Sequence, residues 1–234
     1  MINQEIQVQE NNLIIYKKMD SLTLEIQAIR DLGDGFEKTF KLSRAIQELR
    51  KYVLSNKNIL DTIVSLQGSS LGFRTDKDNA GGYKPEEIVD AVIEAVFYGA
   101  KPTGNQFNII SKKCYLTREY FRDKLNNYSG LIYDFAFPVP TMHGDGTATQ
   151  RVKITWSLNG EKTNEKLLEF SIRVNANMGA DAVLGKAERK SGKWLLEKLN
   201  NTGYPDSDAG EIVQTIPEKT NSQDLLKNIS EKNK

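Results

Sequence analysis

Apolar residues recur along the chain at the 3.6-residue spacing of helices, and most clearly over residues 85–98. Apolar side chains fill one wide face of that segment, Pro85 suits its first turn, and Gly99 suits its stop. The segment is therefore expected to be a core helix. The same spacing predicts further helices at residues 42–54, 59–66, 118–127 and 181–200.

Alternation of apolar and polar residues predicts strands in other parts of the chain. Leu22, Leu24 and Ile26 alternate with polar neighbours, which indicates a short strand near the beginning. Asn159-Gly160 is a strong turn signal between two alternating runs. Strands are expected at residues 107–110, 114–116, 131–137, 152–156 and 168–174. Together the patterns predict an α+β fold, in which an antiparallel β-sheet of hairpins packs with helices.

Composition along the chain predicts one folded region between polar ends. Residues 1–12 are polar and are expected to be disordered, residues 13–204 form a single α+β domain, and residues 205–234 form a polar C-terminal tail. The start has no basic stretch followed by an apolar run, as a signal peptide would, and no segment reaches the roughly 20 apolar residues of a membrane span. We therefore expect a cytoplasmic protein.

Several kinds of chemistry lack their residues in this sequence. The 234 residues contain one cysteine, Cys114, and one histidine, His143, too few for an internal disulfide or a Cys/His zinc cluster. Residues 179–186 resemble a phosphate-binding loop, but five residues separate the glycines and Ala187 stands where a hydroxyl must reach magnesium. Without a nucleophile elbow either, the sequence predicts no enzyme, no metal and no cofactor.

The net charge of +1 hides an uneven distribution of charges. Residues 1–40 carry four cations and seven carboxylates, whereas residues 101–124 carry six cations and two carboxylates. Residues 186–198 carry five cations and two carboxylates. An acidic front followed by two basic blocks indicates a polyanionic partner, head-to-tail self-association, or both.

The basic blocks supply the candidate binding residues. In the second block, cations at i, i+3, i+4 and i+7 share one helix face, which either borders a polyanion or is simply solvated: Lys186, Arg189, Lys190 and Lys193. The first block places Lys112 and Lys113 at a hairpin tip, with Arg118 and Arg122 one helical turn apart and Tyr115 as a base-stacking candidate. Arg151, Lys153 and Arg173 are expected on the face of the sheet away from the core.

Two stretches of the chain resemble the RecT/Redβ family of phage single-strand annealing proteins. The first is AVIEAVFYGAKPTGNQFNIISKKCYLTREYFRDKL, with Lys101-Pro102 at the family's turn and Arg118 near its arginine. The second is AERKSGKWLLEKL, with Arg189 and Lys190 at matching positions of the closing helix. The resemblance implies a protein that needs no ATP, coats single-stranded DNA left by a partner exonuclease, assembles into rings or helical filaments, and anneals a complementary strand.

These observations lead to one hypothesis with two alternatives. The hypothesis is an ATP-independent protein that binds and anneals single-stranded DNA in recombination, acts as a homo-oligomer in a bacterial host cell, and docks an exonuclease or a host single-strand-binding protein through residues 217–234. The alternatives are a self-associating phage assembly or scaffolding protein and an RNA-binding module. The hypothesis requires the candidate cations to converge into one continuous trough.

Overall fold

A computed structural model describes residues 17–29, 32, 35–175, 178–201, 203, 204 and 213–215. It confirms the α+β class, and the chain divides into two compact units, residues 1–120 (unit 1) and 121–234 (unit 2). The single domain over 13–204 stays a prediction. The predictions for residues 1–12 and for most of 205–234 lie outside the described residues.

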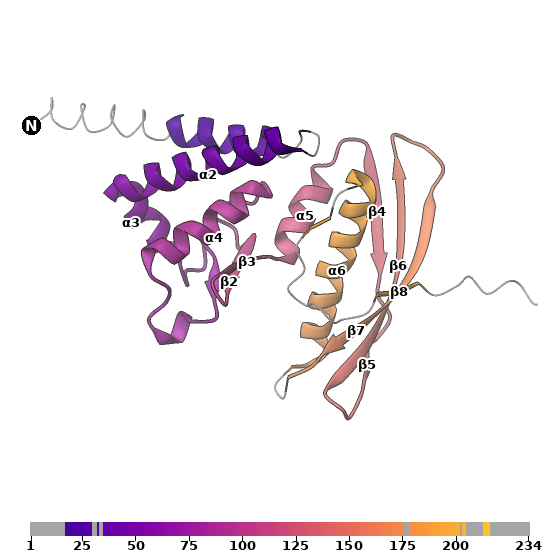
Figure 1. The fold of residues 1–234 in the computed structure, drawn as a ribbon. Coiled ribbons are helices and arrows are strands. Elements are labelled where there is room, and N and C mark those ends of the chain that lie inside the picture. The colour runs from indigo at the N-terminus through magenta and orange to yellow at the C-terminus, as the bar shows by residue number, and fades with distance from the viewer. Residues whose placement is uncertain are drawn as a thin grey trace, which may run out of the picture. The chain divides into compact units, whose positions relative to one another are not determined.

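Unit 1 is built around helix α4 (Pro85–Phe97), which confirms the core helix expected over 85–98. Seven of its thirteen residues are buried, and it packs against α2 (Phe36–Ser55), α3 (Lys57–Ser65) and strand β3 (Lys113–Leu116), as Figure 1 shows. Helices α2 and α3 correspond to the predicted segments 42–54 and 59–66. The helical periodicity of these segments was therefore sufficient to find them.

The short strand expected at residues 22–26 is wrong, because residues 17–29 are helical. Leu22, Ile26 and Ile29 are buried at helical spacing, whereas Leu24 keeps 65% of its surface exposed. Leu22 and Ile26 would share one face of a strand, but they are also about one helical turn apart. This short run therefore fits both the strand period and the helix period. Burial of one helical face decided between them.

A three-stranded sheet completes unit 1. Strand β1 (Arg74–Thr75) pairs in parallel with β2 (Phe107–Ile110), which pairs antiparallel with β3. The hairpin turn consists of Ser111 and Lys112, both at positive φ, so Lys113 is the first residue of β3 rather than part of the tip. A short 3-10 helix, η1 (Asp78–Ala80), lies between β1 and α4 in the chain.

Unit 2 is a sheet with a helix packed on one face. The strands are β4 (Leu131–Ala136), β5 (Thr141–Met142), β6 (Thr147–Leu158), β7 (Asn164–Arg173) and β8 (Val213–Thr215). Their order is β4-β6-β7-β8, all antiparallel, with β5 also paired to β6. Helix α6 (Ala180–Asn200) packs on β6 and β7 (Figure 1), where the Trp156 and Trp194 rings meet at 5.6 Å. The predicted hairpin and closing helix are confirmed.

Helix α5 (Arg118–Asn126) ends the first unit and begins the second, and its part in unit 2 approaches α6 closely. Gly192 of α6 is buried, and a Cβ at this position would lie 2.8 Å from the Cβ of Phe121. Glycine therefore allows the two helix backbones to come together at this point.

Candidate nucleic-acid interface

In unit 1, two side chains from the segment before α4 hold the β2–β3 turn in place. The Tyr83 hydroxyl donates to Asp76 Oδ1 at 2.6 Å and accepts the Lys112 backbone N–H at 3.2 Å. Asp76 Oδ2 accepts the Ser111 N–H at 3.1 Å. The hydrogen bonds from Tyr83 and from Ser111 lower the pKa of the Asp76 carboxyl. Both N–H groups of a turn with non-glycine residues at positive φ are thus satisfied, which offsets its backbone cost.

The predicted basic tip is therefore present but partly neutralised. Lys112 Nζ lies 2.8 Å from Glu87 Oε1, and this hydrogen bond raises the pKa of Lys112. Lys77 Nζ sits 4.4 Å from the centre of the Tyr83 ring, a cation–π distance. Lys113 is exposed at the start of β3. Lys77 and the backbone of Lys112 thus contact Tyr83, although the Lys112 side chain already has a carboxylate partner.

The other two candidates of the first block in unit 1 lie close to the hairpin in the chain. Tyr115 is half-buried on β3, opposite Asn108 of β2. Arg118 Nε lies 2.9 Å from Glu119 Oε1 at the beginning of α5. Tyr115 is therefore only partly accessible to a base.

In unit 2, the sheet face away from α6 carries Arg151, Lys153 and Arg173, as the sequence predicted. Arg151 Nε lies 2.7 Å from Glu169 Oε2, and Lys153 Nζ lies 2.8 Å from Glu165 Oε2, across the β6–β7 pair. Such exposed cross-strand ion pairs are common on the wet side of an antiparallel sheet. These three residues lie on the opposite face of the sheet from α6, so within unit 2 the candidate cations do not converge into the single continuous trough that the sequence hypothesis requires.

The four predicted cations of α6 do not lie on an open helix face. Both interpretations of the sequence, a face that borders a polyanion and a solvated face, assumed that they do. Lys190 and Arg189 are buried, with only 4% and 7% of their surface exposed. Lys193 keeps 13% of its side chain exposed and lies 3.8 Å from Glu197, while Lys186 Nζ donates to the Arg173 carbonyl at 3.0 Å. Burying two adjacent cations is a departure from the usual pattern of a helix on a sheet.

Arg122 of α5 adds a further cation next to α6, and the α5 and α6 segments of unit 2 together form its helix layer. Its guanidinium donates two hydrogen bonds to Glu188 Oε1 of α6, and half of its side chain stays exposed. The α5 and α6 segments of unit 2, residues 121–126 and 180–200, carry seven cations against four carboxylates. The helix layer is therefore positive, whereas the ion pairs of the opposite sheet face neutralise one another.

A row of aromatic rings on β4 and just after it is not among the binding residues predicted from the sequence. Tyr133, Phe135 and Phe137 are half-buried at alternate positions. The rings of the first two lie 5.1 Å apart and those of the last two 6.2 Å apart. Their alternation in the sequence predicts the strand, and the same alternation is the signal that places the three rings in one row.

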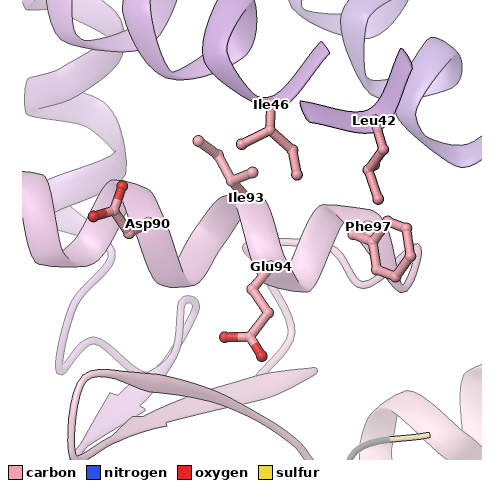
Figure 2. A pocket seen from close by; sticks show the side chains of 6 residues that line it. All are labelled: Leu42, Ile46, Asp90, Ile93, Glu94 and Phe97. Atoms are coloured by element: carbon pink, nitrogen blue, oxygen red, sulfur yellow. The ribbon is translucent and has the colours of Figure 1, made fainter. Parts of the chain in front are cut away.

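Unit 1 also contains a mainly apolar pocket of 330 Å³ between α2 and α4. Figure 2 shows Leu42 and Ile46 of α2 facing Ile93 and Phe97 of α4 across it. Of the two acidic residues in its lining, Asp90 pairs with Arg50 at 2.6 Å and Glu94 accepts the Cys114 N–H at 3.0 Å. Both carboxylates thus have structural partners, and the pocket lacks an evident reactive group.

Across the described ranges, no three His, Cys, Asp or Glu side chains gather as metal ligands. None of the described helices combines the length and the apolar character needed to cross a bilayer. Protein-family models, curated proteins and solved structures provide no match to this chain.

Proposed function

We propose that this protein binds single-stranded DNA without sequence preference and anneals it to a complementary strand without ATP, as RecT/Redβ-type proteins do. The observation that carries the proposal is the positive helix layer of unit 2, with two cations buried inside it. Lysine and arginine bind phosphates without reading sequence, so a layer of this kind suits a strand whose base edges must stay free to pair.

Burial of Lys190 and Arg189 supports a role beyond packing. Removing a cation from water costs several kcal/mol, which its partners in the protein must offset, so an apolar side chain would pack more easily. A charge surrounded by protein is also screened less by salt than an exposed one. We infer that these two residues raise the potential of the layer, while Arg122, Lys186 and Lys193 at its border contact phosphates.

The remaining candidate cations fall into two groups, those left out of the DNA-binding surface and those kept as a second contact. Arg151 and Lys153 face Glu169 and Glu165 on the opposite side of the sheet, so we do not include them in the DNA-binding surface. The β2–β3 hairpin of unit 1, with Lys112 in its turn and Lys113 at the start of β3, remains a second candidate contact for the strand. A phosphate that displaced Glu87 from Lys112 would cost little, because an exposed pair of this kind contributes at most about 1 kcal/mol.

The test measures binding of oligo-dT to the full chain over a range of salt concentrations. Affinity is expected to fall with salt, with a log–log slope of about −0.7 for each phosphate neutralised. The variant Lys186→Met with Lys193→Met should weaken binding and make the slope shallower by up to about 0.7 for each lysine. Methionine keeps the apolar stem of each lysine, and Lys190→Glu is avoided because it would bury a carboxylate.

The matched control removes two cations from the opposite face, as Arg151→Met with Lys153→Met. We expect its affinity for oligo-dT to stay within about twofold of the unmodified protein, since surface charges off the binding path contribute little. Two complementary oligonucleotides added in sequence should anneal faster with the protein and without nucleotide. Binding that does not respond to salt, or equal losses in both variants, would contradict the proposal, and tighter binding of RNA than of DNA of equal sequence would favour the RNA-binding alternative.

A specific observation favours self-association as a second function. Phe36 and Phe40 of α2 have 84% and 71% of their surface exposed, and their rings stack at 6.3 Å. Exposed aromatic pairs are typical of protein interfaces. Sedimentation of the unmodified chain and of Phe36→Ser with Phe40→Ser, without DNA, tests this function: a smaller assembly for the variant supports it, and equal sizes contradict it.

A further inference from the structure

Strand β4 lies at one edge of the described unit 2 sheet, and two aromatic rings on it and one just after it form a row. Tyr133, Phe135 and Phe137 occupy alternate positions, so their side chains project from the same face of the chain. Among the described strands β4 pairs only with β6, and Ile154 opposite Phe135 is completely buried, whereas the three rings of the row stay partly exposed. The aromatic row therefore begins where the core ends.

The row has polar and charged neighbours at one end, near Tyr133. The Tyr133 hydroxyl donates to Asn126 Oδ1 of α5 at 2.7 Å. Burial raises the pKa of Tyr133, the positive charge of Arg122 lowers it and the negative charge of Glu188 raises it, so the ring lies within electrostatic reach of the Arg122–Glu188 ion pair. A ligand along the row would thus meet apolar ring faces beside the positive helix layer. Few ligands combine flat apolar rings with a regularly charged chain.

We propose that Tyr133, Phe135 and Phe137 form a platform on which unpaired bases of a single nucleic-acid strand stack. This inference rests on the proposed function and adds to it the site that distinguishes a single strand from a duplex. Every base has a π-face, so stacking on aromatic side chains tolerates any sequence, as annealing requires. Bases inside a duplex are already stacked on one another and cannot reach the rings.

The spacing of the rings supports an extended strand. Neighbouring ring centres lie 5.1 Å and 6.2 Å apart, whereas successive bases of one B-form strand rise by about 3.4 Å. One base can therefore lie at each ring only if the strand is stretched beyond B-form. Such a strand keeps its pairing edges available, while the cations of α5 and α6 hold its phosphates.

The test compares the affinity of the protein for oligo-dT with its affinity for an abasic strand of equal length. The abasic strand has the phosphates but lacks the bases, so the difference measures what the bases contribute. The unmodified protein should bind oligo-dT more tightly, by on the order of tenfold or more. In Phe135→Leu with Phe137→Leu, binding of the abasic strand should be unchanged and the preference for oligo-dT should shrink several-fold. Tyr133→Phe, which keeps the ring, should retain the preference.

A matched control truncates an exposed apolar residue on the opposite face of β4, as Ile132→Ala at a residue that is 72% exposed, and should bind both strands as the unmodified protein does. If the unmodified protein binds oligo-dT and the abasic strand equally, the stacking platform is wrong while the proposed function stands. A leucine variant that keeps the full preference leads to the same conclusion. If neither strand binds, the proposed function itself fails.

A second measurement needs no variant and therefore does not depend on whether the leucine variant folds. A photoreactive halogenated-uracil strand is crosslinked to the unmodified protein, which is then digested with trypsin. Cleavage after Lys124 and Arg151 releases one peptide, residues 125–151, that contains all three rings. Crosslinks should concentrate on this peptide, and crosslinks found only on other peptides would overturn the proposal.

Discussion

The central helices of the two units, α4 and α6, bury different kinds of side chain. Every buried residue of α4 is apolar, including Ile88 and Val92, and its acidic residues stay at the surface or have partners. Helix α6 buries Arg189 and Lys190 beside Ser191 and Gly192. A helix selected for packing alone would resemble α4. The difference indicates that α6, rather than α4, carries the binding chemistry, and three predictions test this comparison.

The largest effect is expected in α4, from Ile88→Ala. Ile88 is completely buried, so truncation loses transfer free energy and leaves a cavity, and the free energy of unfolding should fall by about 2–5 kcal/mol. Urea denaturation measures the loss. The control is Leu71→Ala, at a residue that is 76% exposed, and it should change stability by less than about 0.5 kcal/mol. Similar losses at both positions would mean that α4 is not the packing centre of unit 1.

A smaller effect is expected where α6 passes α5, from Gly192→Ala. Alanine gains up to about 1 kcal/mol over glycine in an open helix, but the added Cβ would lie 2.8 Å from Phe121, and overpacking costs about 1–3 kcal/mol. We expect a net loss of stability by thermal unfolding. Gly144→Ala, where a Cβ meets open space, should be neutral. A more stable Gly192→Ala protein would show that the helices are not in close contact.

The smallest effect concerns pH and the hairpin turn of unit 1. The Asp76 carboxyl has a lowered pKa because it accepts hydrogen bonds from Tyr83 and Ser111, so the folded protein favours its charged form. Its contribution to stability is therefore present above the ordinary aspartate pKa of about 3.9 and is lost as the pH falls through the lower folded value. Asp76→Asn should make unfolding slightly less dependent on pH in this acid range.

Urea titrations between neutral pH and the acid range measure this dependence, and Asp61→Asn, at an exposed residue of α3, is the control. The control should show the same dependence as the unmodified protein. If Asp76→Asn does the same, the carboxylate does not stabilise the turn, and the turn would be held by its backbone alone.

Local sequence patterns predicted most helices and strands, because each helix or strand buries the face on which its apolar residues recur. Helices α4 and α6 were predicted close to their observed ends, whereas the hairpin of β6 and β7 was found but its strands extend several residues beyond the predicted segments. The strand predicted at residues 22–26 was wrong because a window of five residues fits both the strand period and the helix period. The boundary between the two units falls within α5, where neither glycine, proline nor a change of composition marks it.

The sequence by itself determined the α+β class, the helical periodicity and the count of cations on each segment, because these follow from residue identity and spacing. Only the tertiary structure decided which cations meet carboxylates, which become buried, and which lie on opposite faces of a sheet. Arg151 meets Glu169 because β6 and β7 pair in one register, and Lys190 is buried because α6 packs against the sheet. Such outcomes depend on contacts between segments far apart in the chain, which local pattern cannot encode.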